Sequence, residues 1–240
     1  MTRTVIIAAM PGELKPLVRG WQHEKRNGIH LWRWSYPDGE WIAACGGAGV
    51  NAATRAFAEA EKEGTVSSVI SAGWVGALDS DHLTGHVYRV SGVIDARTGE
   101  RFPIETATIP CWLVTNPRVA DGAEKQRLAA TYDAALVDME AAAIGRLAAM
   151  RGIPFQCVRG VSDGLTDRLP DFNHFIAPNG QFQLARFTLF ALSRPWHWPG
   201  LIRMGENSRK AALGIAASLL DLLDERGHIR QLNGYPNFKS

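Results

Sequence analysis

The chain has 240 residues, of which 46% are hydrophobic and 21% are charged, and its formal net charge is +2. These values are typical of a globular domain with a full core, and they exclude the concentrated basic charge of a nucleic-acid-binding protein. The apolar run near the N-terminus is too short for a signal-peptide core, and no run approaches the roughly 18 to 20 apolar residues that cross a bilayer. We therefore expect a cytoplasmic protein with a single domain over residues 1–240.

The cysteines occur in an odd number and at unrelated spacings, as Cys45, Cys111 and Cys157. This pattern favours reduced, buried thiols over a disulfide framework or a zinc site. The sequence contains no ligand cluster that would hold a metal ion, and we expect no cofactor.

The first predicted elements are a strand and a helix. Residues 5–9 form a continuous apolar run, which is typical of a strand buried on both faces. We expect a helix from Met10 to about Trp21, because Pro11 is tolerated at a helix start. Glu13 lies in the first turn of this helix, where an acid also complements the helix dipole at the surface.

A hairpin and a glycine-rich loop follow. Residues 29–35 and 40–44 predict two strands around the turn at 36–39. The loop that begins at Cys45 opens a helix that ends near Gly64, and its N–H groups could bind phosphate at the helix N-terminus. A tight crossover from strand to helix is the favoured interpretation, since the loop contains no lysine or arginine.

The middle of the chain alternates strands with a polar helix. Residues 66–72 predict another buried strand, and residues 85–95 predict a strand pair with its turn at 95–101. A further strand is expected at 112–117. Residues 121–132 are rich in Ala, Glu, Lys and Arg, which indicates a helix that faces solvent.

Two acids flank the next helix and strand. Glu140 directly precedes an apolar helix that ends at Gly152, and Asp163 follows a short interior strand at 155–161. Open α/β sheets bind ligands at the C-terminal ends of their strands. We therefore expect Glu140 and Asp163 to meet at one end of a sheet.

These residues also carry a family resemblance. The sequence V-D-M-E-A-A-A-I at 137–144, followed by I-P-F-x-x-V-R-G-V-S-D at 153–163, resembles the signature of the nucleoside phosphorylase/nucleosidase superfamily, in particular of its methylthioadenosine/S-adenosylhomocysteine nucleosidases. The resemblance implies a three-layer α/β/α fold with a central mixed sheet. It also implies hydrolysis of the N-ribosyl bond of a 5′-modified adenosine, release of adenine, and a homodimer.

The resemblance assigns a role to each of three acids. Asp163 would donate a proton to N7 of the departing base, and we expect burial behind an apolar strand to keep it protonated. Glu140, ionised, would accept hydrogen bonds from the ribose hydroxyls, with Met139 packed on the sugar. Glu13, in an A-M-x-x-E pattern at 9–13, would orient the attacking water. Taken singly, Glu140 could be a helix-start acid and Asp163 part of a turn.

Further substrate contacts are expected from Gly73, Trp74, Gly76 and Ser162. The family has a T-G-S-x-G-G-L-like loop at 73–78, and its serine helps to hold phosphate in the phosphorylases. Trp74 supplies one donor and a large ring instead, which favours water over phosphate as the nucleophile. A phosphorylase and a nucleoside-binding module without catalysis remain as alternatives.

The C-terminal part departs from the family pattern. Residues 181–204 form an aromatic and basic insertion before the last helix, expected at 208–225, and residues 228–240 form a tail. One interpretation places the aromatic residues in the core or in a dimer interface: Phe182, Phe187, Phe190, Trp196 and Trp198. The other makes the insertion a surface for a lipid-like substrate or for peripheral membrane contact. It is similar to an extension of hopanoid-associated members, which implies an adenosylhopane-like substrate.

Overall fold

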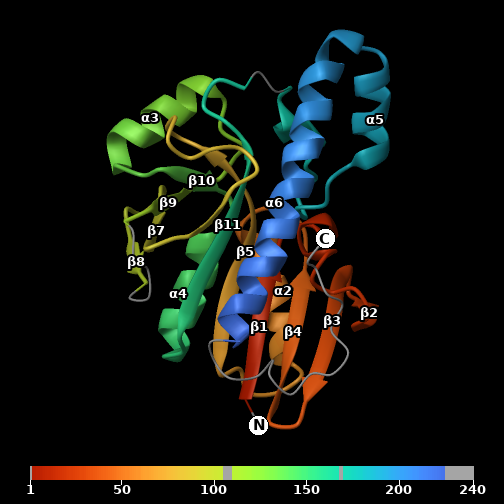
Figure 1. The fold of residues 1–240 in the computed structure, drawn as a ribbon, viewed down its shortest axis with the longest axis vertical. Coiled ribbons are helices and arrows are strands. Elements are labelled where there is room, and N and C mark those ends of the chain that lie inside the picture. Colours follow the sequence, from red (N-terminus) through yellow and green to blue (C-terminus); the bar gives the residue numbers. More distant parts are fainter. Residues whose placement is uncertain (1, 105–109, 168–169, 225–240) are drawn as a thin grey trace.

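The structure is a computed structural model that describes residues 2–104, 110–167 and 170–224 (Figure 1). Its strands are β1 (Thr2–Ala8), β2 (Gln22–Arg26), β3 (Ile29–Tyr36), β4 (Gly39–Cys45), β5 (Ser68–Ala77), β6 (Val87–Arg89), β7 (Gly92–Asp95), β8 (Arg101–Pro103), β9 (Trp112–Thr115), β10 (Leu136–Asp138) and β11 (Phe155–Asp163). Its α-helices are α1 (Pro11–Leu14), α2 (Val50–Glu61), α3 (Gly122–Tyr132), α4 (Ala141–Arg151), α5 (Leu184–Leu192) and α6 (Trp198–Asp224).

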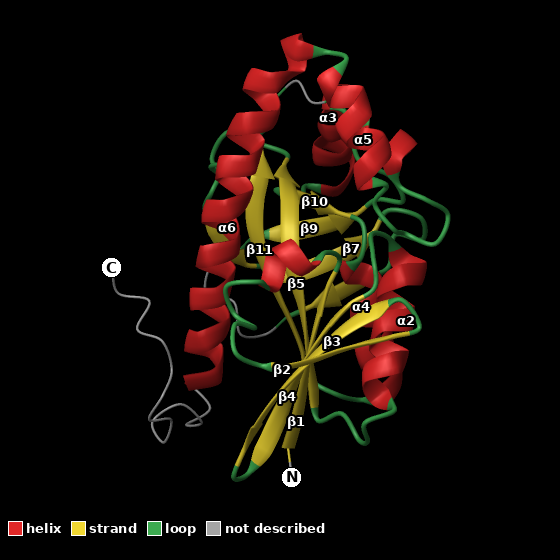
Figure 2. Ribbon diagram, turned by 90° about the vertical axis from the view of Figure 1, so that its right-hand side faces the viewer, coloured by secondary structure: helices red, strands yellow, loops and turns green. Residues whose placement is uncertain are grey.

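The described strands form one mixed sheet in the order β2-β3-β4-β1-β5-β10-β9-β7-β8, with β11 paired to β5 and β6 paired to β11. Strands β1, β4, β5 and β11 run parallel, so their C-terminal ends lie at the same edge. Helices α1 and α6 cover one face of this sheet, and α2 and α4 cover the other (Figures 1 and 2). The predicted three-layer α/β/α architecture with a mixed central sheet is confirmed.

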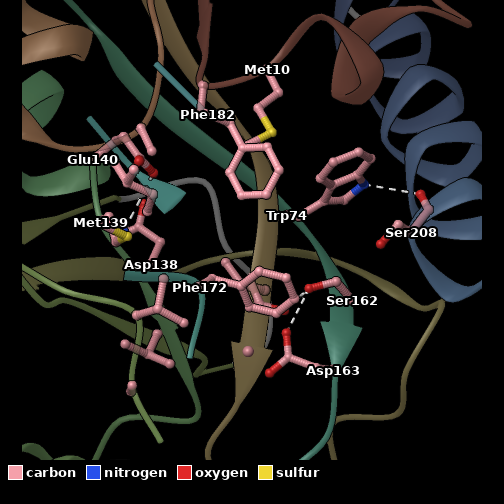
Figure 3. Close-up of a pocket in the computed structure, with 18 of the residues that line it drawn as sticks. Met10, Trp74, Asp138, Met139, Glu140, Ser162, Asp163, Phe172, Phe182 and Ser208 are labelled. Atoms are coloured by element: carbon pink, nitrogen blue, oxygen red, sulfur yellow. Dashed lines mark hydrogen bonds between the residues drawn. The ribbon is translucent and has the colours of Figure 1, made fainter. Parts of the chain in front are cut away.

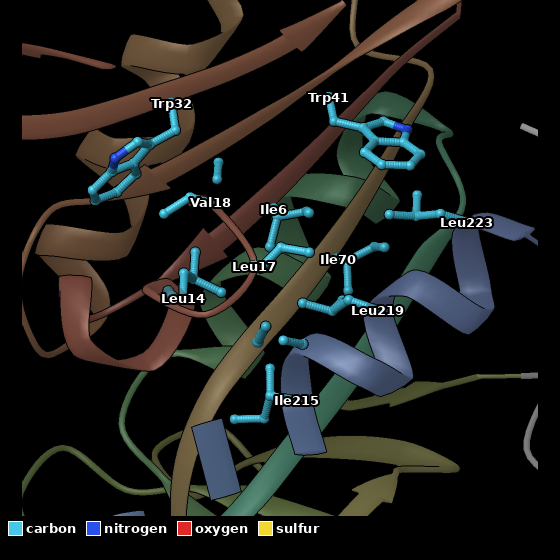
Figure 4. Close-up of a cluster of buried hydrophobic side chains, with 14 of the residues drawn as sticks. Ile6, Leu14, Leu17, Val18, Trp32, Trp41, Ile70, Ile215, Leu219 and Leu223 are labelled. Atoms are coloured by element: carbon cyan, nitrogen blue, oxygen red, sulfur yellow. The ribbon is translucent and has the colours of Figure 1, made fainter. Parts of the chain in front are cut away.

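The core between the sheet and α6 is built from aliphatic side chains together with buried tryptophans such as Trp32 and Trp41 (Figure 4). Ile6 and Ile70 on neighbouring strands face Ile215 and Leu219 of α6, and all four are fully buried. Burying one such side chain contributes about 1.5–3 kcal/mol. The side chains of β1 and β5 that point to this face therefore position α6, whose N-terminal half reaches the edge where the parallel strands end.

Most predicted elements are confirmed, but the first helix is much shorter than expected. It ends at Leu14, and the N–H groups of Leu17 and Val18 both donate to the Leu14 carbonyl at 2.9 and 3.0 Å. Pro16 has no N–H to continue the helical hydrogen bonds, which explains the early end. Strand β2 was not predicted, because its sequence QHEKR is polar and it forms an edge of the sheet.

Residues 85–95 were expected to form two strands that pair with each other, and this pairing is wrong. Strand β6 pairs with β11, whereas β7 forms a hairpin with β8 and also pairs with β9. The turn expected at 95–101 is present, and the Gly99 N–H donates to the Asp95 carbonyl at 2.7 Å. Strand partners depend on tertiary register, which local sequence does not encode.

The last helix begins ten residues earlier than predicted, at Trp198 instead of Ser208. Pro199 lies in its first turn, where a missing N–H is tolerated, and so it does not interrupt the helix. The expected end at residue 225 and the tail at 228–240 lie outside the described residues. Trp196 and Trp198 are 69% and 45% exposed, so assigning them to the core of the chain is wrong.

The three cysteines are buried and free, as expected. Burial raises the pKa of Cys111 and of Cys157 to about 12, which keeps both thiols protonated and unreactive. Among the described residues, no helix is long and apolar enough to span a membrane, and no group of three His, Cys, Asp or Glu side chains could hold a metal ion.

Candidate active site

A cavity of about 320 Å³ lies at the C-terminal ends of β1, β5 and β11 (Figure 3). All three acids expected from the sequence, Glu13, Glu140 and Asp163, line this one cavity. Four of the five residues expected to bind substrate also line it, namely Met139, Gly76, Trp74 and Ser162. The fifth, Gly73, lies behind Glu13 instead of facing the cavity.

Glu13 is held by the backbone at two points. Its Oε2 accepts a hydrogen bond from the Met10 N–H at 2.7 Å, and its Oε1 accepts one from the Trp74 N–H at 2.8 Å. Burial raises the pKa of this carboxyl group, and the two N–H groups partly oppose the rise. Gly73 makes the approach possible, since a Cβ there would lie only 2.8 Å from Glu13 Oε1. The result is a fixed carboxyl group with an increased affinity for a proton.

Glu140 stands at the start of α4 and reaches across to the glycine-rich loop. Its Oε1 accepts a hydrogen bond from the Gly49 N–H at 2.6 Å. The loop at the start of α2 therefore binds a carboxyl group of the protein itself, which supports the crossover interpretation over a phosphate site. Burial, together with the nearby Asp138, raises the pKa of Glu140 to about 8. Hydrogen-bond donors on a ligand would favour its ionised form.

A buried ion pair between Arg159 and Asp138 lies next to Glu140. Arg159 donates to Asp138 Oδ2 at 2.7 Å and to the Ser71 hydroxyl at 2.7 Å. Asp138 Oδ1 also accepts from the Thr115 hydroxyl at 2.6 Å. Removing one partner of such a buried pair costs about 3–5 kcal/mol, so these residues hold the floor of the cavity in place.

Asp163 occupies a different setting from the one expected. The register of β11 against β5 shifts between Val161 and Asp163, and an irregularity of this kind redirects the side chain that follows it. The Asp163 carboxyl group is then contacted by the Lys125 ammonium, with 2.5 Å between Nζ and Oδ2. The setting of Asp163 thus differs from the apolar burial expected from the sequence, because its side chain is 17% exposed and lies beside an ammonium group.

Lys125 is the main residue that sequence reasoning missed. Helix α3 was expected to face solvent, but Lys125 and Leu128 are both buried. The signal was present, because residues three apart lie on the same helix face and Leu128 marks the buried one. Gly76 provides the space, since a Cβ there would lie 3.0 Å from Lys125 Cε and 3.1 Å from Asp163 Oδ2.

The hydroxyl group of Ser162 and the indole group of Trp74 make the remaining polar contacts. The Ser162 hydroxyl lies 2.7 Å from Asp163 Oδ1 and 3.1 Å from the Val75 carbonyl oxygen, and its single proton can serve one of them at a time. The indole Nε1 of Trp74 donates to the Ser208 carbonyl at 2.9 Å (Figure 3). Because this donor is already used, the indole fills space in the cavity and offers no hydrogen bond to an anion.

The opposite wall of the cavity is apolar and comes from the C-terminal segment. It includes Phe172, Phe182, Phe187 and Met204 (Figure 3 shows the two phenylalanines Phe172 and Phe182). These aromatic rings contact one another, with 5.4 Å between the centroids of Phe172 and Phe187 and of Phe182 and Phe187. Phe182 and Phe187 thus form part of a cavity wall, which is compatible with the second sequence interpretation, a surface for a lipid-like substrate.

A side-chain amide pairs with the backbone at the cavity rim. The Val119 N–H donates to Asn173 Oδ1 at 2.9 Å, and Asn173 Nδ2 donates to the Val119 carbonyl at 3.1 Å. Strand β9, expected at 112–117, ends at Thr115, and the segment that follows it brings Val119 to the cavity. An acceptor beside a donor is also the hydrogen-bonding pattern of the N1 and N6 edge of adenine.

Comparison with protein families decides the classification. A model described as the phosphorylase superfamily matches residues 3–115 and 99–191, which together span most of the chain. The chain belongs to the phosphorylase superfamily. A comparison of this superfamily member with curated proteins found no match.

Solved structures share the fold of this superfamily member. One is the 5′-methylthioadenosine/S-adenosylhomocysteine nucleosidase of Helicobacter pylori, with a TM-score of 0.70, 16% identity, and coverage of 94% of this chain and 99% of that chain. Another is the 5′-methylthioadenosine nucleosidase of Arabidopsis thaliana, with a TM-score of 0.69, 17% identity, and coverage of 93% and 96%. A third is the futalosine hydrolase of Helicobacter pylori, with a TM-score of 0.70, 15% identity, and coverage of 93% and 98%.

Proposed function

We propose that the protein is a purine nucleosidase that hydrolyses the N-ribosyl bond of a 5′-modified adenosine and releases adenine. The observation that carries the proposal is the convergence of Glu13, Glu140 and Asp163 on one cavity. Breaking this bond poses two electronic problems, because the base leaves as a poor anion and the ribose carbon becomes cationic. Positioned carboxyl groups address both problems.

The base requires a proton. Asp163 would pass to N7 the proton that it takes from the Lys125 ammonium, 2.5 Å away, so that the lysine becomes neutral and the carboxylate is restored. The Ser162 hydroxyl, at 2.7 Å, steadies the same carboxyl group. General acid catalysis of this kind contributes about 10²–10⁴-fold to the rate.

The ribose carbon becomes cationic as the bond breaks, and a nearby negative charge stabilises it. Two ribose hydroxyls that donate to Glu140 would favour its ionised form, against the burial that raises its pKa to about 8. The carboxylate then lies beside the forming cation, and this interaction strengthens towards the transition state. Met139 lines the same part of the cavity and would pack on the sugar.

The water requires a base. Glu13 is fixed by the N–H groups of Met10 and Trp74, and burial raises its pKa, which suits a group that accepts a proton from water. Water is favoured over phosphate because the Trp74 indole fills the position beside Glu13 and its only donor is engaged by the Ser208 carbonyl. A buried acid at this point would also repel a phosphate anion.

The 5′ substituent is proposed to be apolar. Phe172, Phe182, Phe187 and Met204 line the cavity wall that comes from the C-terminal segment, and apolar walls favour apolar groups. A methylthio group and a larger hydrocarbon such as that of adenosylhopane both fit this chemistry. The solved structures of similar fold include methylthioadenosine nucleosidases, which supports an adenosine substrate.

An assay of base release tests the function. The substrates would be adenosines with small, charged and hydrocarbon 5′ groups, each with and without phosphate, and free adenine would be measured. We expect release without phosphate, fastest with an apolar group, and loss of about 10²-fold or more in the Asp163→Asn variant. A strict requirement for phosphate would make the protein a phosphorylase. Tight binding without release would make it a nucleoside-binding module. Dimerisation and a cytoplasmic location stay predictions from the sequence.

A further inference from the structure

Exposed apolar side chains gather on one part of the surface. Nine large hydrophobic side chains are exposed among the described residues, and six of them lie between residues 184 and 202. The six are Leu184, Leu189, Leu192, Trp196, Trp198 and Ile202. Single exposed apolar residues are normal on a soluble protein, whereas a contiguous group marks an interaction surface. We name these six residues, together with Arg186, Arg194 and Arg203, the α5–α6 patch.

The patch lies at an end of the molecule, away from the sheet. Helix α5 and the first turns of α6 extend beyond the sheet edge (Figures 1 and 2). Contacts hold their connection in shape: the Trp198 indole donates to the Ala191 carbonyl at 2.8 Å, and the Arg194 guanidinium lies 4.2 Å from the Phe190 ring centroid. The exposed side chains therefore stand on a defined scaffold.

The charge of the patch has one sign. Residues 184–205 contain three arginines and neither aspartate nor glutamate. Arg186 and Arg203 are exposed beside Leu189 and Ile202. Tryptophan rings among arginines match the boundary of an anionic bilayer, where the rings lie at the level of the headgroups and the guanidinium groups bind phosphates.

A second copy of the chain fits the α5–α6 patch less well than an anionic lipid surface does. A symmetric contact through this patch would bring the three arginines of each copy into one interface, and residues 184–205 provide no acid to offset them. An anionic lipid surface satisfies the apolar and the basic groups together.

We propose that the α5–α6 patch docks the protein on the surface of an anionic lipid bilayer. The patch adjoins the cavity described above, because Leu184 of the patch and its neighbour Phe187 both line that cavity. Docking would thus bring the apolar wall of the cavity next to the lipid. The proposal does not depend on the reaction that takes place inside.

Sedimentation of the full chain with vesicles tests the proposal. Phosphatidylcholine vesicles with phosphatidylserine should bind the protein at low salt and release it at high salt, and vesicles without phosphatidylserine should bind it weakly. Each exposed arginine near an anionic surface strengthens partitioning about fivefold, so Arg186→Gln with Arg203→Gln should weaken it about 25-fold. Leu189→Ser with Trp196→Ser should also weaken it.

The matched control is Met150→Ser, since Met150 is 75% exposed on α4, outside the patch. The Met150→Ser variant should bind vesicles as strongly as the unmodified protein does. All variants should release adenine from a soluble nucleoside at the rate of the unmodified protein. Absence of sedimentation at low salt would overturn the proposal, as would an equal loss in the control. Conversion of a dimer to monomers by the Leu189 and Trp196 changes, without vesicle binding by the unmodified protein, would assign the patch to a second copy instead.

Discussion

Replacing Lys125 with methionine tests how Asp163 obtains its proton. The change keeps the length of the side chain but removes the ammonium that lies 2.5 Å from Asp163 Oδ2 and 2.7 Å from the Gly164 carbonyl oxygen. We expect turnover to fall about 10²-fold, since the group that supplies the proton is lost. The KM for the nucleoside should change less than kcat.

The stability of the variant follows from the exposure of the pair. Removing one partner of a fully buried ion pair costs about 3–5 kcal/mol, and a hydrogen bond to a charged group contributes about 1.5–3 kcal/mol. The side chains of Lys125 and Asp163 are 5% and 17% exposed, so water can replace part of the lost contact at Asp163. We expect the free energy of unfolding to fall by about 2 kcal/mol.

Urea unfolding followed by circular dichroism measures the stability, and adenine release measures turnover. Lys62→Met is the matched control, because Lys62 Nζ lies 2.6 Å from Glu59 Oε2 but its side chain is 56% exposed. Buried Glu59 keeps its contacts with Arg26 and Asn27, so the exposed Lys62 contributes about 0.5 kcal/mol, and the control should keep full turnover.

The opposite sign of the effect on turnover would refute the reasoning. If Asp163 received its proton from another source, Lys125→Met would leave turnover unchanged or raise it instead of lowering it. A second check combines the change with Asp163→Asn. If the lysine acts through Asp163, adding Lys125→Met to Asp163→Asn should lower turnover no further.

Three further predictions follow from the geometry of the cavity. Glu140→Gln should gain stability relative to the unmodified protein as pH rises from 5 to 9, by on the order of a few kcal/mol in urea unfolding. The pKa of Glu140 is about 8 in the folded protein and lower in the unfolded chain, so ionising this carboxyl group opposes folding. A difference in stability that stays constant across this pH range would contradict the prediction. Gly73→Ala should lower kcat at least about tenfold, since its Cβ would lie 2.8 Å from Glu13 Oε1 and displace the carboxyl group; an unchanged kcat would mean that the position of Glu13 is not critical. Asn173→Ala should lower the KM for adenosines in steady-state assays, because it frees the N–H and carbonyl of Val119 for the base edge; an unchanged or higher KM would exclude this contact.

The sequence was informative about the acids because local patterns determine where they lie. Glu13 follows β1 and Asp163 ends β11, and both strands run parallel to β5, so their ends lie at one edge. Glu140 precedes an apolar helix and follows β10, which runs antiparallel to β5, so its place at the same cavity depends on tertiary pairing. Their placement around one cavity agrees with that reasoning, whereas their catalytic roles stay predictions.

Other features depend on contacts that no local pattern encodes. The pairing of Asn173 with Val119 joins residues 54 positions apart, and the partner of β6 is a strand that follows it by more than 60 residues. The Lys125 contact with Asp163 also spans 38 positions, although the buried face of its helix could have been recognised from Leu128. Sequence reasoning found the elements better than it found their partners.

The ion pair of Arg159 with Asp138 has a consequence for ligand selection. Since Arg159 is already neutralised by Asp138, its charge does little to offset Glu13 and Glu140, which accept hydrogen bonds from uncharged backbone groups. With Glu140 ionised by the ribose hydroxyls, as proposed above, these carboxyl groups would favour a carbon cation over an anion of the same shape.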